Sequence, residues 1–223
     1  MIEFKGRRIP ESLAEIIDPA HTALVVHELL NDFCAEGGKF DKAGKRLDAS
    51  AIIPATVETI AAARAAGIRV LYIRYTRHTD YSSHSDPAIR KAWSQISGDD
   101  LNNLAMATVE GTWGWEFLDE VAPEPGDLVL KKYRPDAFFG THLDHLLRWG
   151  GVRSIVLIGI GSEVGLVPTA MHGFNLGYFC VAVEDAVRPT DPARAQDALR
   201  FIADWGLVAS LAEVTDVWAA KAG

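Results

Sequence analysis

Short runs rich in β-branched residues alternate along this chain with longer stretches whose apolar residues recur at helical spacing. We expect strands at 22–28, 69–75, 127–132, 153–160, 178–184 and 207–211. Helices are expected between them at 54–67, 141–149, 164–175 and 193–205. Strands that alternate with helices imply right-handed crossovers. The sequence therefore predicts a three-layer α/β fold, in which helices cover both faces of a mostly parallel, Rossmann-like, six-stranded sheet.

The length and composition suit one compact domain, since the chain has 223 residues and 48% of them are hydrophobic. We see no repeat, low-complexity tract or linker, so residues 1–223 are expected to form a single domain. The stretch 76–115 is polar and irregular, and it follows the end of a predicted strand. Loops that cover a substrate are often placed there in α/β proteins.

Charge and cysteine content exclude several classes of function. The formal net charge is −8, and the basic residues form no run beyond Lys131, Lys132 and Arg134, so no nucleic-acid partner is expected. No apolar stretch is long enough to span a bilayer and no signal peptide is evident, so no membrane partner is expected either. Cys34 and Cys180 lie far apart, which indicates a reduced, cytoplasmic protein without structural zinc.

Three segments with useful chemistry follow predicted strands. Glu28 ends the first strand, Lys132 ends another, and a glycine-rich turn at 161–165 follows a third. The carboxyl ends of parallel strands meet at one edge of a sheet, which is where α/β proteins bind ligands. A carboxylate, an ammonium group and the N–H groups of a strand-to-helix turn can together bind a carbonyl oxygen or an anion. The sequence therefore predicts a site for a small-molecule substrate at this edge.

Three longer motifs make the pattern more specific: LVVHELLNDFC at 24–34, KYRPDAFFGT at 132–141 and LIGIGSEVGLVPTA at 157–170. In this order they resemble the motifs of the isochorismatase-like hydrolases, which belong to the cysteine hydrolase superfamily. The resemblance covers roughly residues 20–190. It implies a Rossmann-like hydrolase that uses no cofactor and assembles as a homo-oligomer, a dimer or a tetramer.

In most members of that family the three motifs supply an aspartate, a lysine and a cysteine that attacks an amide carbonyl. The matching positions here are Glu28, Lys132 and Gly165. Because glycine offers no nucleophile, the resemblance does not imply covalent amidase chemistry for this chain. Cys34 is the alternative thiol, although a small buried hydrophobic residue is its simpler interpretation, and Cys180 is expected in the core.

The family also contains a chemistry that needs no cysteine. Its isochorismatases hydrolyse a vinyl ether, using the carboxyl of the first motif as a general acid before water attacks the resulting cation. By resemblance Glu28 is this acid. Poor solvation raises its pKa, and the nearby Lys132 lowers it. If the lysine dominates, Glu28 is instead a base that activates water. The substrate is then a small carboxylated or cyclic metabolite.

Two other hypotheses remain open. In the first, the chain is a non-catalytic binding or scaffold member of the family that keeps Glu28 and Lys132 as a buried ion pair. In the second, it is an amidase that uses Cys34.

The resemblance also assigns the turn after the third motif strand to substrate binding. Gly161 and Gly165 match positions whose N–H groups form the family's oxyanion pocket, and Val164 lies between them. A cis peptide bond is implied between Ile160 and Gly161. Glu163 is a second acid near the site or, more simply, a solvated carboxylate at a helix N-terminus.

Further pocket residues are expected outside this turn. Phe138 is expected near the pocket entrance, and Trp113 and Trp115 either wall an aromatic pocket or cap the core. Arg134 either binds a substrate carboxylate or forms a structural ion pair with a nearby aspartate.

The histidines give no metal site. Metal-binding relatives carry an Asp-x-His pattern after the first motif, and residues 35–50 contain no histidine. His78 and His84 are expected to be solvated loop residues. His27 alternates with Glu28 on the predicted strand, so it is expected to face the opposite side of the sheet.

Overall fold

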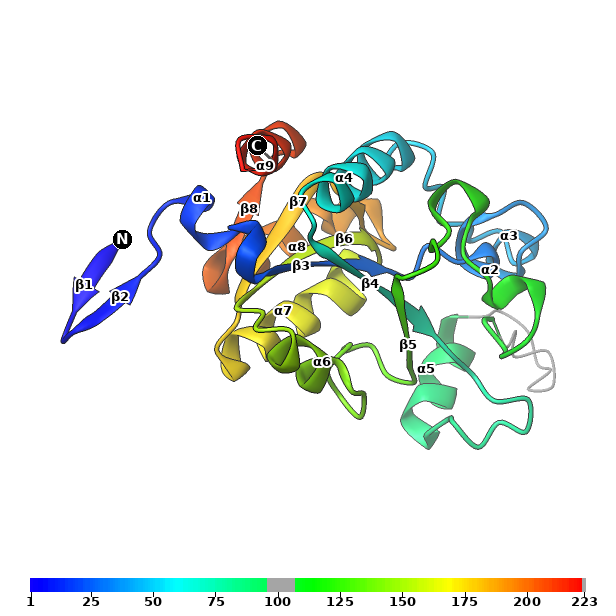
Figure 1. Ribbon diagram of the computed structural model, residues 1–223. Coiled ribbons are helices and arrows are strands. Elements are labelled where there is room, and N and C mark those ends of the chain that lie inside the picture. The colour runs from blue at the N-terminus through cyan, green and yellow to red at the C-terminus, as the bar shows by residue number, and fades with distance from the viewer. Residues whose placement is uncertain (96–106, 222–223) are drawn as a thin grey trace.

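The computed structural model describes residues 1–95 and 107–221. A parallel sheet with strand order β5-β4-β3-β6-β7-β8 runs through its centre (Figure 1). Each of the six predicted strands is present, so the predicted α/β fold class is confirmed. Their bounds are β3 Thr22–His27, β4 Arg69–Tyr75, β5 Leu128–Lys132, β6 Ser154–Ile160, β7 Phe179–Arg188 and β8 Leu207–Ala209.

Helices cover both faces of this sheet (Figure 1). One face carries α4 Ile53–Ala65 and α9 Leu211–Ala219. The other carries α6 Leu143–Trp149, α7 Val167–Leu176 and α8 Ala195–Trp205. The four predicted helices are confirmed, with small shifts at their ends. Among the described residues, no helix is both long and apolar enough to cross a membrane.

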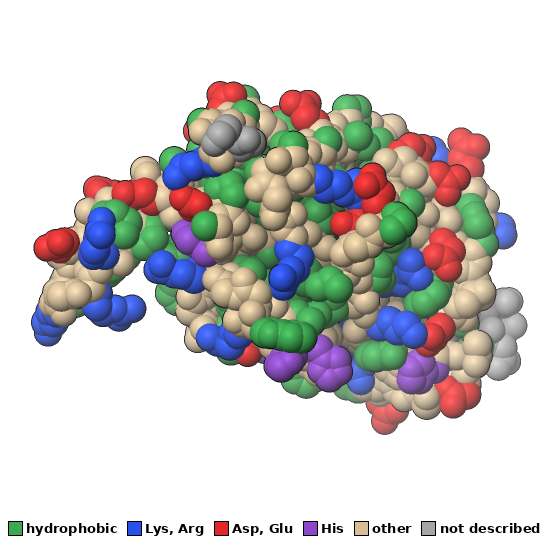
Figure 2. Space-filling view, in the orientation of Figure 1, with side chains coloured by type: hydrophobic (Ala, Val, Ile, Leu, Met, Phe, Trp, Pro, Cys, Tyr) green, Lys and Arg blue, Asp and Glu red, His purple; other side chains and the backbone are tan. Residues whose placement is uncertain are grey.

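Several elements were not predicted. Two are longer helices, α9 and α5 Asp86–Gln95, and the others are short: the hairpin strands β1 Ile2–Phe4 and β2 Arg7–Ile9 and the helices α1 Leu13–Ile16, α2 Asn31–Cys34 and α3 Lys39–Lys42. Helices of four residues hold too few apolar positions to show a period. The hairpin projects from the body of the protein and carries exposed basic side chains (Figures 1 and 2). Part of the irregular stretch 76–115 lies outside the described residues.

Strand alternation determines which side chains reach the site. Val26 faces the layer of α4 and α9, whereas Val25 faces the layer of α6, α7 and α8. Alternation therefore places His27 on the same face as Val25. On β5, Leu130 lies in the layer of α6, α7 and α8, so Lys132 shares that face. The last residues of two strands thus point towards the start of α7.

Asp32, in α2, fixes the segment that precedes β5. Its side chain is buried and accepts hydrogen bonds from the backbone N–H of Thr108 at 2.6 Å and of Lys39 at 3.1 Å. A Cβ at Gly114 would lie 2.1 Å from the Asp32 carboxylate, so the close approach of this segment requires glycine. The carboxylate therefore joins two loops that the sequence keeps far apart.

The substitution Asp32→Asn tests this anchor. We expect it to lower the free energy of unfolding by about 1–3 kcal/mol, because an amide nitrogen would face one of the two backbone donors. Urea denaturation of the variant and the wild type measures the change. Asp119→Asn, at an exposed position, is the matched control. Equal stabilities for the two variants would contradict an anchoring role.

Candidate active site

The backbone turns sharply where β3 ends. Glu28 follows the strand with a φ of 58°, in the left-handed region. A non-glycine residue held there costs on the order of 1–3 kcal/mol, and such strain is concentrated at functional sites. The turn also ends the strand's alternation, so the side chains of both His27 and Glu28 approach Lys132. The prediction that His27 faces the opposite side from Glu28 was wrong, because alternation holds only within the strand.

His27, Glu28 and Lys132 form a buried polar cluster. Lys132 Nζ lies 2.9 Å from Glu28 Oε1 and 2.7 Å from His27 Nε2, and it also donates to the carbonyl oxygen of Pro135. Because an ammonium group can only donate, Nε2 of the imidazole accepts and Nδ1 carries the proton. His27 Nδ1 then faces Glu28 Oε2 at 3.6 Å. The cluster thus joins the ends of β3 and β5.

Burial controls the protonation of this cluster. Desolvation raises the pKa of Glu28, although Lys132 and Arg77 favour its carboxylate form. Desolvation also lowers the pKa of Lys132, against the attraction of Glu28. The pKa of His27 lies well below its ordinary value because burial, and then Lys132, disfavour the imidazolium. Burial therefore outweighs the lysine at Glu28, and its protonated form persists to higher pH than in a solvated glutamate.

Gly165 packs directly against the imidazole of His27. A Cβ at this glycine would lie 2.2 Å from His27 Cε1 and 3.1 Å from both ring nitrogens. Gly165 belongs to a single π-helical turn, Ser162–Leu166, and its φ is not positive. The ring of His27, rather than the backbone conformation, therefore requires glycine here. The imidazole fills the volume into which a side chain at position 165 would project.

The turn before α7 differs from its prediction in two ways. The peptide bonds of the described residues are all trans, so the expected cis bond before Gly161 was wrong, and a left-handed φ of 70° at Gly161 makes the turn instead. The N–H of Gly165 donates to the carbonyl of Gly161 at 2.6 Å and is thus used within the turn. Glu163 is not simply solvated, because it accepts from the N–H groups of Thr190 and Asp191 at 3.0 Å.

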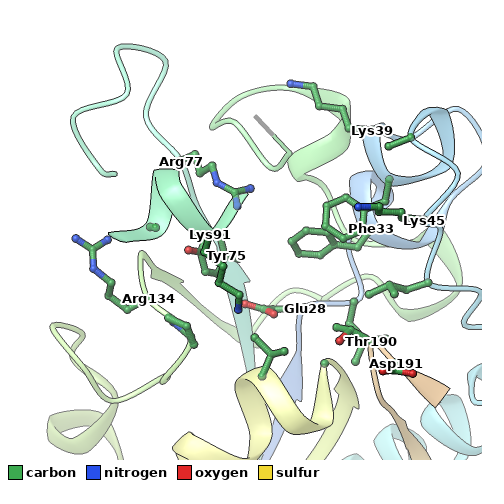
Figure 3. Close-up of a pocket in the computed structure, with 18 of the residues that line it drawn as sticks. Glu28, Phe33, Lys39, Lys45, Tyr75, Arg77, Lys91, Arg134, Thr190 and Asp191 are labelled. Atoms are coloured by element: carbon green, nitrogen blue, oxygen red, sulfur yellow. The ribbon is translucent and has the colours of Figure 1, made fainter. Parts of the chain in front are cut away.

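A cavity of about 1360 Å³ opens beside this cluster (Figure 3). Of the predicted site residues, Glu28, Gly161, Val164 and Arg134 line it. The Glu28 side chain is 11% exposed, whereas Lys132 is fully buried behind it. Glu28 is thus the member of the cluster that a molecule in the cavity can contact.

Two other predicted pocket residues, Phe138 and Trp113, do not line the cavity. Phe138 is buried in the hydrophobic core that α6, α7 and α8 share. Trp113 is 56% exposed and belongs to a short 3-10 helix before β5. Arg134 forms no ion pair with an aspartate among the described residues, because its guanidinium donates to the carbonyls of Ser83 and Tyr133.

Sequence reasoning missed most of the charged groups in the cavity. Two of them follow the rule of strand ends: Arg77 lies just after β4 and Arg188 ends β7. The same rule that found Glu28 and Lys132 could have found both. The remaining cations come from loops and short helices, namely Lys39, Lys45, Arg46 and Lys91. His84, expected in solvent, also lines the cavity, and burial lowers its pKa.

The two thiols are poor candidates for a nucleophile. Cys34 and Cys180 are free and buried, and burial raises the pKa of each thiol to about 12. The thiolate is the reactive form, and very little of it exists near neutral pH at such a pKa. Within the part of the chain that is described, no three His, Cys, Asp or Glu residues are grouped so as to hold a metal ion.

In a comparison with protein families, the model of the isochorismatase domain matches residues 22–217. The chain belongs to the isochorismatase family. Curated relatives include the ureidoacrylate amidohydrolase RutB of Enterobacter sp. (strain 638), 34% identical over 205 residues, with 89% of each chain covered. The protein of the same name from Pantoea ananatis is 33% identical and covers 93% of this chain and 85% of its own.

Solved structures of the family share the fold. A cysteine hydrolase from Pseudomonas syringae superposes with a TM-score of 0.79 at 23% identity, covering 92% of this chain and 96% of that one. N-carbamoylsarcosine amidase from Thermoplasma acidophilum gives a TM-score of 0.65 at 28% identity, with 86% and 96% covered. These relatives are named as hydrolases, so this chain lies within a family of hydrolytic enzymes.

The contact between Gly165 and His27 predicts a strong coupling between the two positions. Gly165→Ala should lower the free energy of unfolding by about 1–3 kcal/mol, because the new methyl group overlaps the imidazole. In a His27→Ala background the same change should cost much less, giving a coupling of roughly 1 kcal/mol or more. Urea denaturation of the two single variants and the double variant measures this coupling.

Gly151→Ala is the control for that cycle: its φ of 67° makes alanine strained there, but nothing lies within 4 Å of the added Cβ, so this strain is independent of His27. Its effect should simply add to that of His27→Ala. Additive effects for the pair at 165 and 27 as well would show that the imidazole does not occupy the space above Gly165.

Proposed function

We propose that this protein is a hydrolase that works by non-covalent acid/base catalysis, with Glu28 as the proton donor and Lys132 as its electrostatic partner. The position of Glu28 carries this proposal. Its carboxyl group faces the cavity from a strained backbone, it contacts a fully buried lysine, and its pKa is raised by desolvation. Strain, burial and a shifted pKa at one residue in a cavity are typical of a catalytic acid.

Each member of the buried cluster has a defined part in the proposed reaction. Protonated Glu28 transfers its proton to an unsaturated carbon of the substrate, and water adds to the resulting cation. The proton that this water loses returns to Glu28, and collapse of the adduct releases two products. Lys132, 2.9 Å away, stabilises the carboxylate present between these steps. His27 holds Lys132 while remaining neutral, so it adds no second positive charge.

In this proposal Gly165 stands where cysteine hydrolases have their nucleophilic cysteine, so the reaction has no covalent intermediate. Support comes from the imidazole that fills the volume above this glycine and from the high pKa of Cys34. The proposed substrate is a carboxylated or cyclic metabolite, with Gly161, Val164 and Arg134 in contact with it. The names of the relatives favour an amide as the alternative scissile group, with Glu28 then acting as a base towards water.

A non-catalytic binding protein is the second candidate. The observation in its favour is that His27 and Lys132 are completely buried and hydrogen-bonded to each other, as the members of a purely structural network would be. In that case the cavity binds a ligand that is released unchanged.

We also propose that the protein is a cytoplasmic homo-oligomer. The exposed apolar residues Ile2 and Phe4 on the projecting hairpin support an interface between copies, and the two free cysteines support a reducing compartment (Figure 1).

Substitution of the acid tests the catalytic role. Glu28→Gln should lower kcat/KM by about 10²–10⁴-fold, because glutamine cannot transfer a proton. The assay follows product formation by mass spectrometry with a panel of carboxylated enol ethers and amides. Glu184→Gln, at an exposed position on β7, is the control. Undiminished turnover by Glu28→Gln would contradict the proposal, and tight binding without turnover by the wild type would favour the second candidate.

The pH dependence separates an acid from a base. A general acid acts in its protonated form, so kcat/KM should fall as the pH rises through the pKa of Glu28, which lies above the ordinary 4.5. A general base would give the opposite slope through the same pKa. Initial rates measured across the acidic and neutral range decide between the two roles. The change in kcat/KM through this pKa should be missing in Glu28→Gln, since the group that titrates is then gone.

A further inference from the structure

The cavity is basic although the chain as a whole is acidic. The sequence contains 30 acidic and 22 basic residues, yet seven lysine and arginine residues and only two carboxylates, Glu28 and Asp191, are among the described residues that line the cavity. Of these carboxylates, Glu28 is already paired with Lys132. The positive charge is therefore concentrated in one place rather than spread over the surface.

Three of the four arginines that line the cavity form no ion pair with a carboxylate of the described residues, and Arg46 is the exception. Within the described part of the chain, Arg77, Arg134 and Arg188 donate to carbonyl or hydroxyl oxygens and to no carboxylate. Outside the cavity, by contrast, Arg64 and Arg148 each pair with aspartates. In a chain with excess carboxylates this difference indicates that the counter-ion of the cavity is a ligand.

The cations lie on two sides of Glu28 (Figure 3). We call Arg77 and Arg134 the near pair, because both lie on the side of Tyr75. Both arginines lower the pKa of the Tyr75 phenol, whereas Glu28 raises it. Arg77 also acts directly on the pKa of Glu28. An anionic group bound to the near pair would therefore lie beside the proposed proton donor.

We call Lys45, Arg46 and Arg188 the far cluster. Figure 3 shows Lys45 across the cavity from Arg134. Arg46 follows it in the chain, and Arg46 and Arg188 line the same cavity, where both also lower the pKa of Asp48. Arg46 also forms ion pairs with the carboxylates of Glu36 and Asp41, at 3.5 and 3.7 Å, so Lys45 and Arg188 are the members of the far cluster for which the structure shows no ion pair among the described residues. Two separate segments thus bring three cations to the cavity.

We propose that the far cluster is a second anion-binding subsite and that the substrate carries two separated anionic groups. A carboxylate binds the near pair beside Glu28, and a phosphate or a second carboxylate binds the far cluster. The size of the cavity supports an extended molecule, because about 1360 Å³ exceeds the roughly 300–1,000 Å³ of typical ligand sites. Phe33, Phe40 and Leu47 also line the cavity and suit an apolar spacer. The choice of the reacting end rests on the proposed function.

Calorimetric titration with chain-length series tests the subsite. The probes are linear dicarboxylates and ω-phosphonocarboxylates, each compared with a monocarboxylate of equal length. At one chain length we expect a dianion to bind about tenfold more tightly than its monoanionic partner, or better. The tighter of the two series identifies the group that the far cluster prefers. Equal affinities of dianions and monoanions at every length would overturn the proposal.

Variants localise the gain in affinity. Arg188→Gln and Lys45→Gln should reduce the affinity for the dianion to that for the monoanion and leave the monoanion unchanged, whereas Arg134→Gln should weaken both. Lys42→Gln, an exposed lysine of α3 outside the cavity lining, is the control. Equal losses for both probes in Arg188→Gln would also overturn the proposal.

The same titrations with Glu28→Gln keep the two proposals separate. Binding at the two subsites needs no proton transfer, so this variant should retain the preference for dianions. A dianion preference without any turnover by the wild type would refute the proposed function and leave the second subsite standing.

Discussion

The fully buried ammonium group of Lys132 is the constraint on which the site depends. A buried charge without partners is strongly destabilising, so the protein must bring acceptors to it. Glu28, His27 and the carbonyl of Pro135 meet this need. To do so, Glu28 leaves the strand in a left-handed conformation, and the imidazole takes a position that only glycine at 165 permits. One cation thus determines the geometry at the ends of β3 and β5 and at the start of α7.

The sheet was predictable because its central strands are buried on both faces. In β3 and β6 every residue is buried, which gives the continuous apolar runs seen in the sequence. The meeting of Glu28 with Lys132 was predictable for a related reason, since parallel strands end at one edge. The position of His27 was not, because a single left-handed residue after the strand changes which side chains share a face.

The cations that loops bring to the cavity could not be predicted from the sequence. Lys45 and Arg46 lie in a loop that no periodic pattern describes, and contacts far apart in the chain place it. The N–H of Leu47 donates to the carbonyl of Phe33, and the Asp32 carboxylate joins the N–H groups of Lys39 and Thr108. Such contacts depend on the finished fold, so residue types alone could not place these cations in the cavity.

Recognition and proton transfer are linked through Arg77. Its positive charge opposes the rise in the pKa of Glu28 that burial causes. A substrate anion bound to Arg77 and Arg134 would neutralise that opposition and place a further negative charge near the carboxyl group, and both effects favour the protonated acid. Binding of the anionic substrate would therefore complete the protonation on which its own hydrolysis depends. A neutral molecule of the same shape would leave Arg77 uncompensated and Glu28 more ionised, so the charge of the substrate contributes to the chemical step as well as to affinity.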